Sequence, residues 1–228
     1  MNVFSLFFST KIGLMIKGII FDCDGVLLDS EPLFVKATEV MMKAYGIEID
    51  MDSLPDGYGT TMQHYCQILA DAFPDLNIPL DQLVKDCYYY SDLLLMADDL
   101  EPMPGLKQFC QSMYGKGLRL AVASSSPAYY VIHKLKLFQI EPFFDQIITA
   151  DDITHSKPHP EIYLKAMEKM AIGREDLIAI EDAPNGIMSA KAAGLYTIGF
   201  KGSKMLQDTS QADEEVFCFK DIQILKRF

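Results

Sequence analysis

The sequence predicts an α/β fold in which helices cover both faces of a parallel sheet, with a small group of helices inserted into it. Short apolar runs alternate with amphipathic stretches over most of the chain, an order that is typical of such a fold. Residues 32–101 lack this alternation and contain only amphipathic stretches. The chain has 228 residues, half of them apolar, so we expect one large core with an insertion.

The predicted strands are short apolar runs that end at turn-forming or polar residues. Residues 17–21 form the first run, which ends at Asp22-Cys23-Asp24-Gly25 and is expected to be buried. The further expected strands are residues 118–123, 146–149, 177–180, 196–199 and 215–217. Between them, apolar residues recur at helical spacing and prolines suit the first helical turns. The helices expected there are residues 105–114, 127–137, 160–170 and 184–193.

The inserted segment, residues 32–101, contains three expected helices with no strand between them. These helices are residues 35–45, 61–73 and 80–96. The segment is followed by Pro102, Pro104 and Gly105, a composition typical of a domain boundary. The predicted domains are an α/β core of residues 17–31 and 102–228, a helical domain of residues 32–101 and an N-terminal extension of residues 1–16.

Two groups of side chains in the inserted segment have an ordinary structural interpretation. Met41, Met42 and Met62 are expected to fill the core of its helices. The tyrosine run at residues 88–90 is expected to pack between helices, although only some of three consecutive helical residues share a face.

Charge and cysteine content restrict the kinds of partner and compartment. The chain has 20 basic and 32 acidic residues, a net charge of −12, which disfavours nucleic acid as a partner. Residues 32–101 carry most of this charge, with three lysines, no arginine and thirteen acids. The five cysteines are scattered without a Cys-x-x-Cys pair, and no run of 18 apolar residues is present. We expect a reduced, cytoplasmic protein that is a monomer and binds neither nucleic acid nor membranes.

The start of the chain contains an apolar stretch, residues 3–8, of the kind found in signal peptides. No basic region precedes it and no small-residue cleavage site follows it, so a signal peptide is disfavoured. Met15 lies just before the first expected strand and is an alternative start of translation, with residues 1–14 as an extension.

Polar residues follow the carboxyl ends of four expected strands. They are, in strand order, Asp22 with Asp24, Ser124-Ser125-Ser126, Lys157 after a loop, and Glu181-Asp182. Each cluster alone has a structural interpretation as a turn, a helix cap, a solvated lysine or an acidic helix entry. Ligands of open parallel sheets bind just beyond the carboxyl ends of the strands, so we expect the clusters to converge. Together they supply the positive charge that a phosphate requires and the negative charge that a hard cation requires.

The residue types in these clusters indicate phosphoryl transfer. Two or three carboxylates without histidine suit Mg²⁺, which prefers oxygen ligands and bridges to phosphate. One carboxylate can attack phosphorus, and an acid two residues later lies on the same side of an extended segment, near enough to protonate the leaving oxygen. A hydroxyl, backbone N–H groups at a helix start and one lysine would neutralise the phosphoryl oxygens. Such a set forms a phosphoryl-transfer site.

Four ordered motifs resemble those of the haloacid dehalogenase superfamily, and within it the beta-phosphoglucomutase-like phosphatases with a helical cap. The motifs are residues 21–31 (FDCDGVLLDSE), 122–125 (VASS), 156–160 (SKPHP) and 180–186 (IEDAPNG). The resemblance extends from about residue 17 to residue 200. Any one motif would be weak, but four in this order are strongly specific. The resemblance implies a Rossmann-like core with the helical domain as its cap.

The resemblance also implies roles for the acidic residues. It makes Asp22 the nucleophile and Asp24 the general acid and base. It implies that Mg²⁺ is held by Asp22, Asp182 and the backbone carbonyl of Asp24, with Glu181 assisting.

For the substrate, the resemblance assigns phosphate binding to Ser124, Ser125 and Lys157. Within the cap, Tyr58 and His64 are candidates for substrate selection. A solvated position is equally compatible with His64, because polar residues collect at loops and helix tips.

Two departures from the resembling mutases favour a phosphatase. Phe34 stands where those enzymes have a histidine near the cap entry, and residues 56–61 lack the arginine of their specificity loop. A mutase must hold a sugar with two phosphates, which an acidic cap without arginine disfavours.

We therefore expect a Mg²⁺-dependent phosphatase that hydrolyses a small phosphorylated metabolite, in particular a sugar phosphate, through an aspartyl-phosphate. One alternative is a beta-phosphoglucomutase-type phosphomutase. An alternative of another class is a non-catalytic phospho-acceptor or binding module, which could also use a carboxylate-rich site with Mg²⁺.

Overall fold

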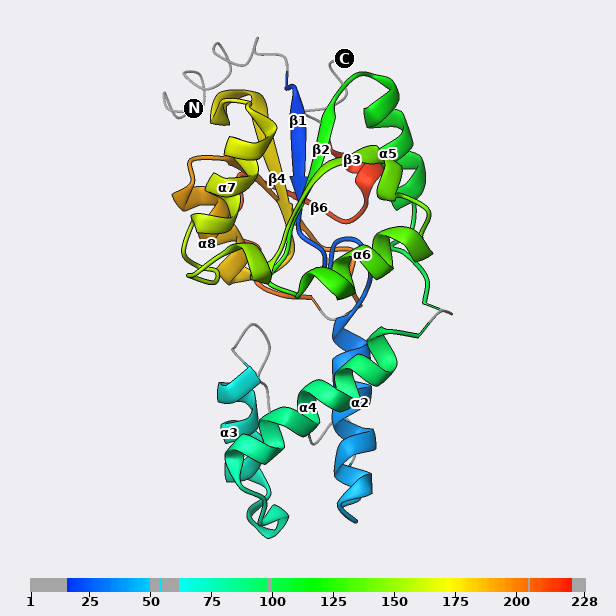
Figure 1. Cartoon of the computed structure of the whole chain (residues 1–228), viewed down its shortest axis with the longest axis vertical. Helices are drawn as coiled ribbons and strands as arrows, with labels where there is room; N and C mark the ends of the chain where they lie inside the picture. Colours follow the sequence, from blue (N-terminus) through cyan, green and yellow to red (C-terminus); the bar gives the residue numbers. More distant parts are fainter. Residues whose placement is uncertain (1–15, 50–53, 55–61, 98–99, 205, 223–228) are drawn as a thin grey trace, which may run out of the picture.

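The computed structural model describes residues 16–49, 54, 62–97, 100–204 and 206–222. Its centre is a six-stranded parallel sheet in the order β3-β2-β1-β4-β5-β6 (Figure 1). The strands are β1 (Gly18–Phe21), β2 (Arg119–Ala123), β3 (Phe144–Ile148), β4 (Leu177–Glu181), β5 (Tyr196–Phe200) and β6 (Glu214–Val216). β1 pairs with β2 on one side and with β4 on the other, so successive strands spread from β1 in both directions.

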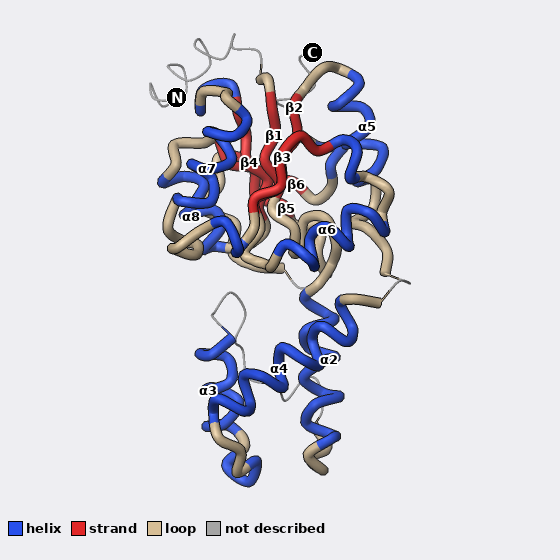
Figure 2. Tube along the Cα trace, viewed as in Figure 1, coloured by secondary structure: helices blue, strands red, loops and turns tan. Residues whose placement is uncertain are grey.

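Helices cover both faces of the sheet (Figure 1, Figure 2). α5 (Leu106–Gly115) and α6 (Ala128–Leu137) pack on one face, and α7 (Glu161–Met170) and α8 (Pro184–Ala192) pack on the other. Side chains of a strand point alternately to opposite faces, so Ile19 lies in one apolar cluster and Ile20 in the other. Burial on both faces is the reason that these strands are nearly continuous apolar runs in the sequence.

Three further helices form a separate group beyond the carboxyl ends of the strands (Figure 1). They are α2 (Glu31–Ala44), α3 (Met62–Ala72) and α4 (Leu80–Leu95). Their apolar faces form a cluster of their own, in which Met41, Leu69 and Leu83 are completely buried. The group therefore has its own hydrophobic core, distinct from the two clusters of the sheet.

The helical group contacts the sheet part of the molecule through the start of α2 and the end of α4. Leu33 and Phe34 of α2 and Leu95 of α4 pack with the apolar cluster on the α5 and α6 face. The Tyr129 hydroxyl of α6 donates a hydrogen bond to Asp92 of α4 at 2.8 Å. These contacts place the helical group over the edge at which the strands end (Figure 1).

This architecture confirms the predicted fold class. Each predicted strand and helix is present among the described residues, with bounds that differ by four residues at most. α2 begins at Glu31 and not at residue 35, because an acidic residue and Pro32 both suit a first helical turn. β3 begins at Phe144, two residues earlier than predicted, where its register with β2 shifts between Leu120 and Ala121.

The expected roles of side chains in the helical group are confirmed in part. Met41 and Met42 are buried in the helical cluster, and Met62 packs against it. Of the tyrosine run, Tyr90 packs against the cluster, but the other two are exposed, because successive helical side chains point about 100° apart. His64 is exposed on α3, whereas Tyr58 and residues 1–15 lie outside the described residues.

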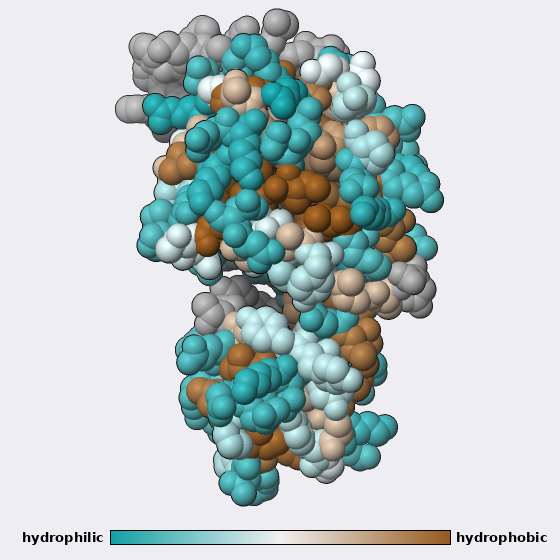
Figure 3. Space-filling view, viewed as in Figure 1, coloured by the Kyte–Doolittle hydropathy of each residue, from teal (hydrophilic) through white to brown (hydrophobic). Residues whose placement is uncertain are grey.

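The surface in view in Figure 3 is mostly hydrophilic, with smaller apolar patches on both the sheet part and the helical group. Among the described residues, no helix combines the length and the apolar character needed to cross a membrane.

Replacing Leu120 by alanine is expected to lower the free energy of unfolding by about 2–5 kcal/mol. Leu120 is completely buried in the cluster beneath α5 and α6, so the change removes packed atoms and leaves a cavity. Urea denaturation followed by circular dichroism measures the effect. The control is Leu164→Ala on α7, where the side chain is 46% exposed and the change should be below about 0.5 kcal/mol. Equal losses in the two variants would contradict this core.

Candidate active site

The carboxyl ends of β1, β2 and β4 lie beside one another because these strands are neighbours in the sheet. Asp22 follows β1 directly, Ser124 follows β2, and Glu181 is the last residue of β4. The loop between the short helix η4 (Ala150–Asp152) and α7 brings Lys157 to the same edge. The polar clusters of the sequence therefore converge at the carboxyl end of β1, where the strand order changes direction. Ligands usually bind at this position in such sheets.

The ammonium group of Lys157 lies at the centre of these residues. Its Nζ is 2.6 Å from Asp22 Oδ1 and 2.6 Å from Glu181 Oε1, and it donates to the Ala123 carbonyl at 3.1 Å. The Tyr163 hydroxyl of α7 also donates to Glu181 Oε1, at 2.5 Å. Burial alone would lower the pKa of Lys157, but Asp22 and Glu181 raise it overall. The lysine therefore places a positive charge beside Asp22.

Three carboxylates form an acidic cluster beside Lys157. Asp22, Glu181 and Asp182 are buried, and each offers one oxygen within 4.8 Å of the others. Burial and then Glu181 raise the pKa of Asp22 to about 7, although Lys157 opposes the shift. Burial, followed by Asp22 and Glu181, raises the pKa of Asp182 well above its ordinary value. These shifts reflect the cost of keeping several negative charges close together out of water.

The acidic cluster fits a bound Mg²⁺ ion. It supplies oxygen ligands, which Mg²⁺ prefers. Glu181 Oε2 is buried and has no hydrogen-bond partner among the described residues, so this oxygen is available as a ligand. Positive charge at this position would also offset the repulsion that raises the carboxyl pKa values.

Two glycines leave space for the carboxylates of this cluster. A Cβ atom on Gly25 would lie 1.8 Å from Asp182 Oδ2, and the φ of Gly25 is +72°, which other residues rarely adopt. A Cβ atom on Gly186, in the first turn of α8, would lie 2.1 Å from the Glu181 carboxylate. A larger residue at either position would displace one of the acids.

Two hydroxyl groups hold the carboxylate of Asp24. Ser126 Oγ donates to one of its oxygens and the Tyr130 hydroxyl of α6 donates to the other, both at 2.7 Å. Burial and then the charge of Asp24 raise the pKa of Tyr130, which keeps this hydroxyl protonated. Sequence reasoning missed Tyr130 and did not single out Ser126 from its neighbours. The sequence did offer one signal for Tyr130, which is its position in the first turn of α6, the helix that begins at this edge of the sheet.

The two serines predicted to bind phosphate have different surroundings. Ser124 is buried at the edge, and its Oγ accepts a hydrogen bond from the Ser126 N–H at 3.0 Å. The side chain of Ser125 is exposed. Among the three consecutive serines, the hydroxyl that contacts Asp24 belongs to Ser126.

Gln207 joins the helical group to the acidic cluster, a contact that sequence reasoning also missed. Its side-chain amide donates to Glu31 Oε1 at 3.2 Å and to Asp182 Oδ2 at 3.5 Å. Glu31 is the first residue of α2, and burial, followed by the charges of Asp24 and Asp29, raises its pKa to about 7. The start of α2 is thus coupled to the surroundings of Asp182.

Comparison with known proteins agrees with the sequence motifs. The sequence profile of the haloacid dehalogenase-like hydrolases matches residues 19–200. A phosphorylated carbohydrates phosphatase from Thermotoga maritima is 29% identical over 182 residues, covering 80% of this chain and 83% of that protein. Hexitol phosphatase B from Escherichia coli is 31% identical over 180 residues, covering 78% of this chain and 81% of that protein.

A solved structure shows the same architecture. It is the crystal structure of a Thermotoga maritima protein provisionally assigned as a beta-phosphoglucomutase, with a TM-score of 0.78 and 27% sequence identity. The match covers 92% of this chain and 99% of that one. With the profile match over all four motifs, these findings confirm the predicted family: the chain belongs to the haloacid dehalogenase-like hydrolases.

Proposed function

We propose that this hydrolase is a Mg²⁺-dependent phosphatase that releases phosphate from a phosphorylated carbohydrate through an aspartyl-phosphate at Asp22. One observation carries the proposal: a buried carboxylate at the end of the central strand contacts a largely buried ammonium group and lies beside two further carboxylates. This combination offers a nucleophile, positive charge for the phosphoryl oxygens and ligands for a cation. The substrate class is supported by two relatives, which are named as phosphatases of phosphorylated carbohydrates and of hexitols.

The proposed reaction has two steps that use the same two aspartates. In the first step, a carboxylate oxygen of Asp22 bonds to phosphorus, the bond from phosphorus to the sugar oxygen breaks, and Asp24 gives that oxygen a proton. In the second step, water attacks phosphorus, Asp24 takes a proton from that water, and the Asp22 carboxylate leaves. The net change is hydrolysis of one phosphate ester.

Lys157 and Ser124 are the proposed phosphate-binding side chains, with Ser125 beside them. The Lys157 ammonium group lies 2.6 Å from the attacking carboxylate, so it would face the oxygens of a phosphoryl group bonded there. The serine run leads into the N-terminus of α6, where backbone N–H groups favour an anion. These groups would neutralise charge on the phosphoryl oxygens as the bonds change.

The proposed ligands of Mg²⁺ are Asp22, Glu181, Asp182 and the backbone carbonyl of Asp24. When bound, the ion would supply positive charge that stabilises the phosphoryl group and offsets repulsion among the carboxylates. Glu181 has a second function in this proposal, because its other oxygen accepts hydrogen bonds from Lys157 and Tyr163 and so positions the lysine.

We further propose that residues 32–101 act as a cap domain on a core of residues 17–31 and 102–228. The separate core of the helical group supports this division, as does its position over the edge that holds Asp22. Closure would exclude water until the phosphoryl group has been transferred. The absence of arginine from residues 32–101 favours a substrate with one phosphate over a sugar bisphosphate.

The proposed location is the cytoplasm, and the proposed working form is a monomer. The five described cysteines are free thiols, four of them buried, which suits a reducing compartment.

Asp22→Asn is expected to lower phosphate release from sugar monophosphates by about a thousandfold or more, because the amide is a poor nucleophile. Release is measured over a panel of sugar phosphates and nucleotides with Mg²⁺ present. Asp75→Asn is the control, since Asp75 is exposed in the helical group, and it should keep the wild-type rate. Phosphate release by Asp22→Asn at the wild-type rate would refute the proposed nucleophile.

The same panel separates the alternative functions. A phosphatase releases one free phosphate for each sugar phosphate consumed. A phosphomutase would instead yield an isomeric sugar phosphate, which nuclear magnetic resonance of the sugar detects. A phospho-acceptor would take up one phosphoryl group per chain without further turnover.

Chelation of Mg²⁺ is expected to abolish phosphate release, and Asp182→Asn is expected to raise the Mg²⁺ concentration for half-maximal rate by about tenfold or more. The reason is loss of one anionic ligand from the acidic cluster. A Mg²⁺ titration of the initial rate measures the effect. Glu168→Gln, an exposed acid on α7, should leave the titration unchanged. An unchanged titration of Asp182→Asn would exclude Asp182 as a ligand.

Tyr130→Phe is expected to lower kcat by about tenfold with little change in KM, because Asp24 loses one of two hydrogen bonds that orient it. Asp24→Asn, which removes the acid itself, should lower kcat by about a hundredfold or more. Tyr114→Phe on α5, where the side chain is 51% exposed, controls for loss of a hydroxyl. A wild-type kcat for Tyr130→Phe would show that Tyr130 does not position the acid.

A further inference from the structure

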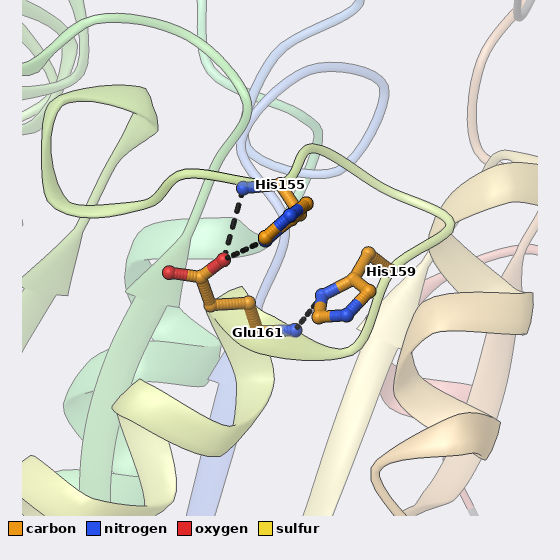
Figure 4. A group of neighbouring side chains, drawn as sticks. All are labelled: His155, His159 and Glu161. Carbon is orange, nitrogen blue, oxygen red and sulfur yellow. Dashed lines mark hydrogen bonds and ion pairs between the residues drawn. The ribbon is translucent and has the colours of Figure 1, made fainter.

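A second group of metal-ligating side chains lies outside the acidic cluster, on the loop before α7 and on the first residue of that helix. It consists of His155, His159 and Glu161, which are neighbours in Figure 4, with the Glu161 carboxylate turned toward His155. Each offers one ligand atom within 4.8 Å of the others, and the two imidazole rings are 4.6 Å apart between centroids. Both histidines are exposed, so an ion in solution can reach them.

Hydrogen bonds to the carboxylate and the backbone N–H of Glu161 hold this group in place. The backbone N–H of His155 donates to Glu161 Oε2 at 2.9 Å, and the imidazole Nδ1 of His155 lies 3.0 Å from the same oxygen. The backbone N–H of Thr154 donates to Glu161 Oε1 at 3.1 Å, and His159 Nδ1 accepts from the Glu161 N–H at 3.3 Å. The loop is therefore folded back on the start of α7, with the His155 ring beside the Glu161 carboxylate and the His159 ring beside the Glu161 backbone N–H (Figure 4).

The donor atoms of this group differ in kind from those of the acidic cluster. Two imidazole nitrogens and one carboxylate oxygen suit Zn²⁺ and similar transition-metal ions, whereas Mg²⁺ prefers oxygen ligands alone. The backbone N–H groups of Thr154 and His155 lower the pKa of Glu161 to about 2, so its carboxylate is ionised at neutral pH. Lys165 contacts Oε1 of this carboxylate at 3.1 Å, and Oε2 is the oxygen that faces His155.

We propose that His155, His159 and Glu161 form a second metal site, which binds a Zn²⁺-type ion at the surface with water completing its coordination. Two imidazoles and one carboxylate, with an open position for water, are also the ligand set of several known zinc sites.

The position of this site gives it a mechanical consequence. The two histidines flank Lys157 in the sequence, two residues before it and two residues after it. An ion bound to both histidines and to the first residue of α7 would link the two ends of the loop that carries Lys157. Binding is therefore expected to restrain that loop, whether or not the proposed phosphatase activity is correct.

Zinc binding to the untagged full chain, measured by isothermal titration calorimetry in excess Mg²⁺, tests the proposal. Wild type should bind one more Zn²⁺ per chain than His155→Gln/His159→Gln, or bind its Zn²⁺ at least about tenfold more tightly. His64→Gln, which removes another exposed histidine, should bind zinc like wild type. Asp182→Asn, which alters the acidic cluster, should retain the zinc affinity that depends on the two histidines.

Proton resonances of the histidine rings give a second readout that does not depend on activity. With less than one equivalent of Zn²⁺, the signals of His155 and His159 should shift or broaden before those of His64 and His133. Equal stoichiometry and affinity of zinc in wild type and the double variant would overturn the proposal. It would also fall if the two ring signals were unchanged while zinc bound, because the ion would then lie elsewhere.

Discussion

The geometry of the candidate active site depends on one largely buried ammonium group, that of Lys157. Three carboxylates can share a buried volume only if positive charge offsets their mutual repulsion and their loss of hydration. Lys157 supplies part of that charge through direct contacts with Asp22 and Glu181. Since Asp22 follows β1, Glu181 ends β4 and the lysine comes from the loop before α7, the same contacts also tie three parts of the sheet edge together. The charge balance thus serves both folding and the proposed chemistry.

The strand order explains how residues far apart in sequence reach this edge. Lys157 and Asp22 are separated by 135 positions, yet β1 lies between β2 and β4, and their carboxyl ends are adjacent. The helical group is inserted directly after β1 and so lies over the same edge (Figure 1). Its own core lets it keep its internal structure if it moves relative to the sheet. It is joined to the sheet part by polar contacts, such as Gln207 with Glu31, and by apolar packing at the start of α2 and the end of α4.

This separation divides the proposed tasks between two parts of the chain. The sheet part holds the groups that are proposed to act on phosphorus, in a geometry fixed by buried contacts and by the space left at Gly25 and Gly186. The helical group is acidic and lies where the organic part of a substrate would extend. In this proposal, residues at the sheet edge determine the type of reaction, whereas side chains of the helices and their loops would determine which substrate binds.

The fold class and most elements could be predicted from the sequence, because buried parallel strands and amphipathic helices leave distinct local patterns. The convergence of the acids, the lysine and Ser124 at one edge could also be predicted, since each lies at the end of a strand or in the loop after one and belongs to an ordered motif. The sequence alone did not show that Tyr130 and Ser126 hold Asp24, or that Gln207 bridges Glu31 and Asp182. Those contacts depend on helix orientation and on side-chain direction, which no local pattern encodes. Only the tertiary structure decided them, because hydrogen bonds between distant segments form where packing of the whole core places the two atoms within reach.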